Sequence, residues 1–190
     1  MSTMQKVLLG GALVALLLCS GAGLFGYYRL WPRLKEGSTE AVETEVAYQV
    51  QQSMENALVT RQHDPCAVRL ASNDLDINTY TDSSGDSQVN IVNGDATITN
   101  AFVQVNANGI DISVADMGFH GVPAVQDGSF TLIETDLDTG LASLLIDGSA
   151  LETGFVRGVN EGLQSARLIP TSVLVENGAL IIGCDAQTGL

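Results

Sequence analysis

The sequence predicts an α+β fold, in which an N-terminal transmembrane helix is followed by an antiparallel sheet packed against one long and one shorter amphipathic helix. Three observations predict it. The first is an uncharged apolar run, Val7–Tyr28. The second is the recurrence of apolar residues every four positions in two later segments, which is typical of amphipathic helices. The third is strict alternation of apolar and polar residues between those segments, with Asn-Gly pairs at the breaks, which is typical of antiparallel hairpins.

The chain of 190 residues divides near residue 35. Residues 1–35 form the predicted membrane anchor and neck, and residues 36–190 form one domain that is long enough to bury a core. All 22 acidic residues lie in the second part, against four basic ones, so its formal charge is −18. This charge makes nucleic acid a poor partner, and it disfavours electrostatic docking of the domain to anionic lipid headgroups.

The apolar run has the length of a membrane span. It holds 22 residues, where a helix needs about 20 to cross a bilayer, and Trp31 follows where an interfacial aromatic belt would lie. We expect a single-pass protein of the cell membrane, with its domain outside the cytoplasm because the segment before the helix is short. Two alternatives stay open, namely a cleaved signal peptide with Val7–Leu18 as its apolar core, and a lipoprotein acylated at Cys19.

Two of the three cysteines lie near the edges of the domain. A bridge between Cys66 and Cys184 would close a loop of more than 100 residues, which chain-entropy models credit with about 4–5 kcal/mol. Such a bridge needs an oxidising compartment, in agreement with a domain outside the cytoplasm. The alternative is two unrelated buried thiols. No cysteine or histidine cluster has metal-ligand spacing, so we expect no metal site and no cofactor.

The first element of the domain is a long amphipathic helix, predicted over residues 39–60. Ser38 or Thr39 can cap it, and Glu40 and Glu43 suit its positive N-terminal end. The apolar residues that recur along one face are Val42, Val46, Val50, Met54 and Leu58.

The period changes to two from about residue 67 to residue 133. Leu75 and Ile77 begin this alternation, and later apolar residues such as Ile110 and Ile112 continue it. Antiparallel strands with one apolar face and one wet face are expected. The turns between the strands are predicted at Asn93-Gly94, Asn108-Gly109 and, less strongly, Asp127-Gly128.

A second, shorter amphipathic helix follows. Residues 149–152 read Ser-Ala-Leu-Glu, which fits a capping box. Glycines recur at four-residue spacing between its apolar residues, and we expect this ridge to let the helix lie close against a sheet. A last hairpin is predicted around Asn177-Gly178. The apolar residues of the helix are Leu151, Phe155, Val159 and Leu163, and its glycines are Gly154, Gly158 and Gly162.

The closing hairpin has a further pattern. Residues 170–182 read Pro-x-Ser-Val-x-Val-x-x-Gly-x-Leu-x-Ile, and residues 109–130 contain Gly-Ile-Asp-Ile-Ser-Val, a Gly-Phe-His-Gly-Val-Pro bend and Asp-Gly-Ser-Phe. In these motifs and in the order of its elements, the stretch 40–183 resembles the LmeA-like phospholipid-binding family, whose domains look like half of a TULIP module. The resemblance implies a long helix cradled by a strongly curved antiparallel sheet, with an apolar groove between them that takes acyl chains.

We therefore expect a non-catalytic domain that binds phospholipid or another hydrophobic ligand. The alternative function is a structural or accessory subunit that packs on a larger membrane protein complex. The same apolar stripes would also form an ordinary closed core, and that interpretation stays open. The residues expected to line the groove are Val46, Val50, Met54, Leu58, Phe155, Val159 and Leu163.

Nothing in the sequence forms a coherent catalytic set. Neither His63 nor His120 belongs to a hydrolase or metalloprotease motif, and His120 is expected to serve a bend. The segment Asp74-x-Asp76-x-Asn78 starts like a calcium loop, but it lacks the glycine at position 6 and the glutamate at position 12.

Overall fold

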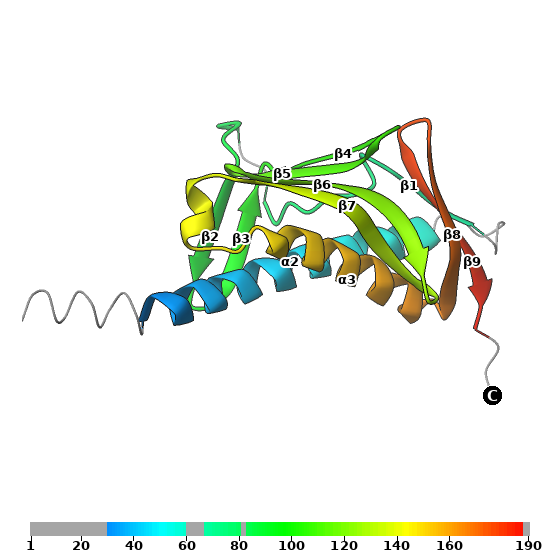
Figure 1. Cartoon of the computed structure of the whole chain (residues 1–190), viewed down its shortest axis with the longest axis horizontal. Helices are drawn as coiled ribbons and strands as arrows, with labels where there is room; N and C mark the ends of the chain where they lie inside the picture. Colours follow the sequence, from blue (N-terminus) through cyan, green and yellow to red (C-terminus); the bar gives the residue numbers. More distant parts are fainter. Residues whose placement is uncertain (1–29, 60–66, 81–82, 188–190) are drawn as a thin grey trace, which may run out of the picture.

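The computed structural model of the chain describes residues 30–59, 67–80 and 83–187. Its fold is α+β, as expected, with two helices side by side beneath curved antiparallel sheets (Figure 1). Within the described ranges, no helix is both long enough and apolar enough to cross a membrane. The predicted span, residues 7–28, lies outside the described residues, so the anchor stays a prediction.

Helix α2 extends from Trp31 to Val59 and therefore begins well before residue 39. It continues without a break across the predicted division at residue 35. The predicted cap is wrong, because Ser38 and Thr39 lie inside the helix. Instead of capping, the hydroxyl oxygen of Thr39 accepts a hydrogen bond of 2.9 Å from the backbone nitrogen of Asp147, which joins α2 to the start of the other helix.

Helix α3 extends from Ser149 to Ser165. The predicted capping box is wrong, because Ser149 already lies inside the helix and the N-cap is Gly148, where no side chain caps. The carboxylate of Asp147, just before the N-cap, accepts hydrogen bonds from the backbone nitrogen of Ser149 at 3.1 Å and from the Ser149 hydroxyl at 2.9 Å. The backbone bond, followed by the hydroxyl bond, lowers the pKa of Asp147 below its ordinary value.

Three antiparallel sheets cover the helices. One has four strands in the order β4-β5-β6-β7, one has three in the order β1-β9-β8, and one is the pair β2-β3. Strand β1 thus pairs with the last strand of the chain and not with its neighbour in sequence. The strands are β1 (Ala67–Ala71), β2 (Gln88–Val92), β3 (Asp95–Thr99), β4 (Phe102–Asn106), β5 (Gly109–Val114), β6 (Met117–Gln126), β7 (Ser129–Thr139), β8 (Leu168–Glu176) and β9 (Ala179–Ala186), and a short 3₁₀ helix, η2 (Leu141–Leu144), follows β7.

Three of the predicted hairpin turns are confirmed. Asn93-Gly94, Asp127-Gly128 and Asn177-Gly178 each connect a pair of neighbouring strands. All six residues have positive φ, which is the requirement of a type I′ turn.

The fourth predicted turn, Asn108-Gly109, is wrong by one position. Asn106 pairs with Gly109, so Ala107 and Asn108 form the turn and Gly109 is already the first residue of β5. Gly109 has a φ of 149° and lies very close to β6. A Cβ atom at Gly109 would lie 2.5 Å from the carbonyl oxygen of Gly121 on β6.

A bulge bends the four-stranded sheet between His120 and Val122. There Gly121 of β6 stands alone opposite two residues of β7, Glu134 and Thr135. An extra residue on one strand increases the local twist. The bulge lies in the segment expected to bend, and it lets β6 and β7 curve over α3 (Figure 1).

The segment of Leu75 and Ile77 is not a strand, which corrects the first of the expected alternations. Both side chains are nevertheless buried, with exposures of 2% and 0%. The Ser53 hydroxyl of α2 donates to the carbonyl oxygen of Asp76 at 3.3 Å and accepts from its backbone nitrogen at 3.2 Å. The alternation therefore reflects packing of an extended loop on α2.

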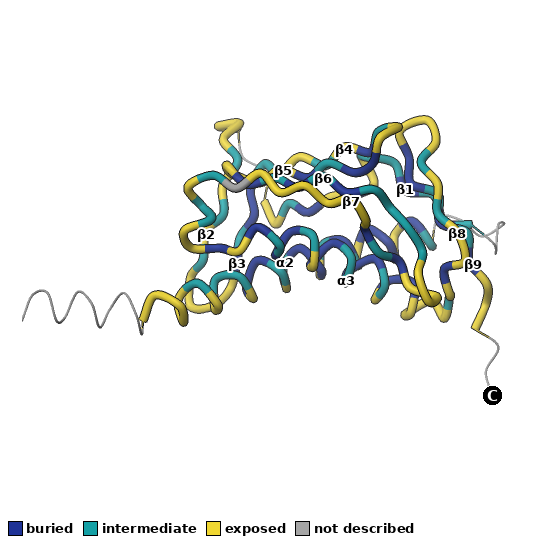
Figure 2. Tube along the Cα trace, viewed as in Figure 1, coloured by how far each residue is buried: buried dark blue, intermediate teal, exposed yellow. Residues whose placement is uncertain are grey.

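The core lies between the helix layer and the sheets (Figure 2). Both helices turn their buried faces toward the sheets or toward each other. The core is built mainly from aliphatic side chains, together with the aromatic rings of Phe119, Phe130 and Phe155.

Candidate functional site

The residues of α2 that were expected to line a groove instead contact a ridge of glycines on α3. Val50 has no exposed surface, and a Cβ atom at Gly158 would lie 2.8 Å from its Cβ and 2.5 Å from the carbonyl oxygen of Ala47. The same contact repeats along both helices in the same order, so the helices run parallel. The pairs are Gly154 with Val46, Gly158 with Val50 and Gly162 with Met54.

This arrangement corrects one expectation. The glycine ridge lies against the other helix and not against a sheet. The absence of a side chain on each glycine lets the α3 backbone touch the side chains of α2 directly, which offsets the loss of helix propensity of about 1 kcal/mol per glycine. The helix pair is therefore closed along the length of the ridge.

The larger side chains of α3 are buried as well. The Phe155 ring lies 6.3 Å from that of Phe119 and 6.1 Å from that of Phe130, both in tilted or edge-on contacts with the sheet. Val159 and Leu163 have exposures of 0% and 1%. Helix α3 thus presents its glycines to α2 and the Phe155 ring to the four-stranded sheet.

The structure brings the seven predicted ligand residues together, but as core positions. Six of them have exposures of at most 1%, and Leu58 is half-buried near the end of α2. Leu163 also borders a surface hollow of about 260 Å³ whose lining includes Asn160 and Gln164. Ligand binding by these residues stays a prediction, and it requires the packed layers to separate.

A second candidate lies on the outer face of the four-stranded sheet. His120 of β6 is paired with Asp111 of β5 on one side and Asp136 of β7 on the other. The His120 Nδ1 lies 2.7 Å from a carboxylate oxygen of Asp111, and the Asn106 amide donates to the other oxygen of that carboxylate. His120, Asp111 and Asp136 border an open hollow of about 440 Å³ together with Ser113 and Asp138.

The chemistry available in this hollow is limited. Asp111 occupies Nδ1 of the imidazole and so fixes the orientation of the His120 ring. Over the described part of the chain, no group of three or more His, Cys, Asp or Glu side chains is placed to hold a metal ion. The arrangement stabilises a pair of strands beside the bulge, in agreement with the expected bend.

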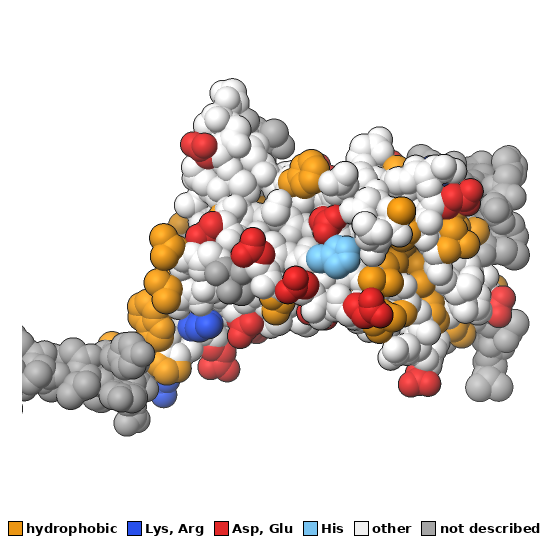
Figure 3. All heavy atoms as spheres, turned by 45° about the horizontal axis from the view of Figure 1, so that its top comes forward, with side chains coloured by type: hydrophobic (Ala, Val, Ile, Leu, Met, Phe, Trp, Pro, Cys, Tyr) orange, Lys and Arg blue, Asp and Glu red, His pale blue; other side chains and the backbone are white. Residues whose placement is uncertain are grey.

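The other half of the same outer face is apolar. Val122 pairs with Ile133 across β6 and β7, and Ala124 lies two residues further along β6. Ile133 is exposed, and the other two are half-buried. Figure 3 shows hydrophobic side chains gathered directly beside the histidine. We call Val122, Ala124 and Ile133 the outer strip.

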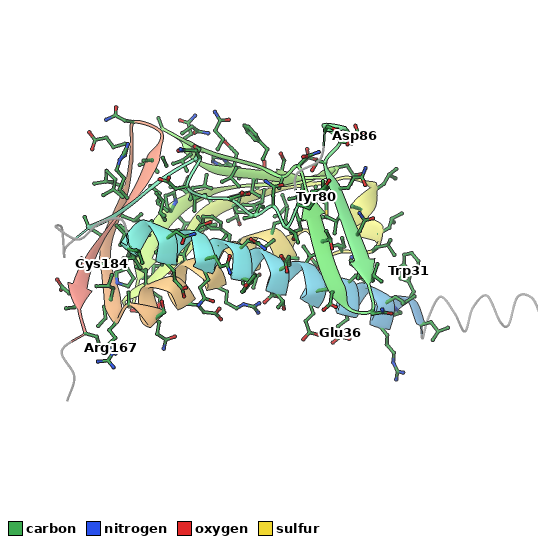
Figure 4. The ribbon with its side chains drawn as sticks, turned by 180° about the vertical axis from the view of Figure 1, so that it is seen from behind. Trp31, Glu36, Tyr80, Asp86, Arg167 and Cys184 are labelled. Atoms are coloured by element: carbon green, nitrogen blue, oxygen red, sulfur yellow. The ribbon has the colours of Figure 1, made fainter. Side chains whose placement is uncertain are left out.

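A separate group of exposed apolar residues surrounds the start of α2. The segment after Gly140, which contains three leucines, is joined to α2 where the Asp147 backbone nitrogen donates to Thr39. Figure 3 shows hydrophobic side chains gathered at this end of the molecule, and Figure 4 shows Trp31 at the same end. This group was not predicted from the sequence, although three leucines within five residues are a signal for it. We call it the leucine patch: Leu30, Trp31, Leu34, Leu141, Leu144 and Leu145.

The structure describes only one of the two cysteines of the predicted disulfide. Cys184 of β9 is buried, and its sulfur lies 3.6 Å from the carbonyl oxygen of Ile182. Cys66 lies outside the described residues. The bridge therefore stays a prediction.

Comparison with known proteins gives this chain no relative. No family model, no curated protein and no solved structure matches it. The similarity to LmeA-like proteins consequently rests on the motifs described above.

Proposed function

We propose that this chain is a non-catalytic, single-pass protein of the cell membrane whose acidic domain lies outside the cytoplasm and packs as an accessory subunit on a larger membrane complex. The closed interior is the observation that most favours this function over ligand binding. Six of the seven residues expected to line a groove have exposures of at most 1%. Ligand pockets are commonly cavities of several hundred Å³, and direct contact of the α3 backbone with α2 leaves no such space along the ridge.

The outer strip is the surface that suits a partner. It is an apolar area on a domain with a formal charge of −18, and carboxylates of Asp111 and Asp136 lie next to it. Protein interfaces combine a core depleted in charge with a polar rim. A partner with an apolar centre and basic residues around it would match this surface in both respects.

Site-specific photo-cross-linking in membranes tests the proposal. A photoreactive amino acid at position 133 of the full chain is expected to give one adduct of defined size. The control is position 92 on β2, which belongs to a different sheet and is more accessible, since Val92 is 65% exposed and Ile133 38%. The charged variant Ile133→Asp should abolish the complex. Absence of any adduct at 133, or equal adducts at both positions, would contradict the accessory function.

Binding of a hydrophobic ligand is the second candidate. The long helix beneath a curved sheet is the arrangement that the LmeA-like resemblance implies, and this supports it. The ligand would enter only if the helices and the sheet moved apart. Mass spectrometry of an organic extract of the purified full chain would then find about one phospholipid per chain that persists through detergent exchange. An extract without stoichiometric lipid counts against this candidate and leaves the first untouched.

A further inference from the structure

We propose that the leucine patch is a second membrane contact, through which η2 and the first turns of α2 lie in the interface of the bilayer that anchors the chain. The inference rests on the membrane anchor of the proposed function, and it is independent of the accessory role. Such a contact would fix which side of the domain faces the membrane.

The leucine patch is strongly exposed. Leu141 is 79% exposed, Leu34 60% and Leu144 57%. Single exposed leucines are normal on a protein surface, but adjacent ones on two elements form an apolar area of the kind that marks a protein or membrane contact. On a domain with so many carboxylates, such an area stands out.

The exposed leucines of η2 are also held in place by the fold. The backbone nitrogens of Leu141 and Ala142 donate to the carboxylate of Asp116, at 3.1 Å for Ala142, and the nitrogen of Gly140 donates to its carbonyl oxygen at 3.0 Å. The inner side of the same segment buries Ile146, which is 4% exposed. The outward direction of the three leucines is therefore built into the fold.

The position of the patch along the chain also favours this contact. Helix α2 begins at Trp31, three residues after the predicted span ends at Tyr28. With a rise of 1.5 Å per residue, Trp31 and Leu34 lie about 5 and 9 Å beyond that end if the helix continues. The headgroup layer is about 5–8 Å thick on each side of a bilayer, so Trp31 falls within it and Leu34 at its outer edge.

The η2 segment sets the direction in which α2 tilts. The chain just after η2 is joined to α2, because the Asp147 backbone nitrogen donates to Thr39. Thr39 is about 16 Å beyond Tyr28 on the same scale, so an upright helix would hold the leucines of η2 clear of the bilayer. Tilting α2 toward the η2 side lowers Leu141, Leu144 and Leu145 into the interface. Interfacial apolar segments are buried about 5–10 Å into the headgroup and acyl boundary.

Charge favours the same end. Arg33 and Lys35 lie in the first turns of α2, and the basic side chains visible in Figure 3 lie beside the patch. Glu36, Glu40 and Asp147 are also near, but Lys35 attracts Asp147. The rest of the domain is acidic and is repelled by an anionic leaflet. The bilayer is therefore the occupant that this end of the molecule suits best.

Tryptophan quenching in vesicles tests the inference. The chain has one tryptophan, Trp31, so the full chain in vesicles of brominated phosphatidylcholine reports its depth directly. Replacing Trp31→Phe together with Leu144→Trp moves the only indole to η2. The matched control combines Trp31→Phe with Leu174→Trp on β8, at the other end of the molecule and also exposed (Figure 1). Circular dichroism checks that each variant is folded.

Emission is expected to fall about twofold with the indole at 31 or 144 and to stay unchanged at 174, because quenching requires contact with the acyl region. Quenching at 31 without quenching at 144 overturns the inference, because η2 then does not contact the bilayer. The predicted anchor is unaffected by that result. Quenching at all three positions overturns it too, since the contact would then have no direction. Absence of quenching at all three overturns the anchor itself and the inference with it.

Discussion

The absence of a side chain at Gly158 allows α2 and α3 to come into direct contact. We expect Gly158→Ala to destabilise the fold by about 1–3 kcal/mol, because the new methyl would meet the Ala47 carbonyl oxygen at 2.5 Å and overpacking outweighs the gain in helix propensity. Gly37→Ala in α2 is the matched control, since nothing lies within 4 Å of that position, and it should stabilise by about 0.5–1 kcal/mol. Thermal unfolding followed by circular dichroism measures both. A stable Gly158→Ala variant would mean that the helices are not closed.

Asp147 gives stability a dependence on pH. Its hydrogen bonds from Ser149 lower the pKa of Asp147 in the folded state below the ordinary 3.8. The ionised carboxylate therefore contributes fully to the free energy of unfolding above pH 3.8, and this contribution is lost as the pH falls through the lower pKa of the folded state. Asp147→Asn should lower the melting temperature at pH 7, and the deficit should shrink below about pH 4. Ser149→Ala is the control, since it keeps the backbone donor and should cost less. A deficit that is constant with pH would contradict this assignment.

The site residues show what a one-dimensional pattern can and cannot predict. The recurrence of Val46, Val50 and Met54 identified a buried face correctly, because periodicity reports which side of a helix avoids water. It did not report what that face touches. The partner is the glycine ridge of α3, about 110 residues further along the chain, and this pairing depends on how the two helices cross.

Among the elements, the turn residues of hairpins were a more reliable signal than the residues that suggested helix starts or the first strand. The hairpins at Asn93-Gly94 and Asn177-Gly178 were predicted correctly because two adjacent residues determine a type I′ turn. The start of α2 was placed too late because Ser38 and Thr39 resemble caps, whereas Pro32, in the first turn, was the better signal for a helix start. Leu75 and Ile77 alternate like a strand, but no strand among the described residues pairs with them.

The disulfide between Cys66 and Cys184 stays a prediction, because Cys66 lies outside the described residues. It can be tested chemically. We expect the unfolded, unreduced chain to resist alkylation at both cysteines.

Reduction should then lower stability by about 4–5 kcal/mol, because the closed loop exceeds 100 residues. The double variant Cys66→Ser, Cys184→Ser should lose this response to reductant, whereas Cys19→Ser should keep it. Alkylation of both Cys66 and Cys184 in the absence of reductant would show that the two thiols are separate.

At the scale of the whole molecule, the class was predictable and the assembly of sheets was not. Alternation and turn residues indicated an antiparallel α+β domain, and the structure has one. The strands nevertheless form three sheets, since β1 joins β8 and β9 from the other end of the chain. Such a pairing has no local signature. The sheet of β1, β9 and β8 lies at one end of the molecule, and α2 begins at the other end, on the side of the predicted anchor (Figure 1).

The predicted anchor therefore determines how the molecule is placed in a cell, and it can be tested directly. We expect the full chain to stay in the membrane pellet during alkaline carbonate extraction and to keep its intact mass of 19.9 kDa. Leu16→Arg with Leu17→Arg should release it, since each arginine at the centre of a span costs about 2.5–3.5 kcal/mol. Protease added outside intact cells should cut the domain. A shorter mass would favour a cleaved signal, a heavier one acylation at Cys19, and protection of the domain from external protease would contradict the predicted orientation.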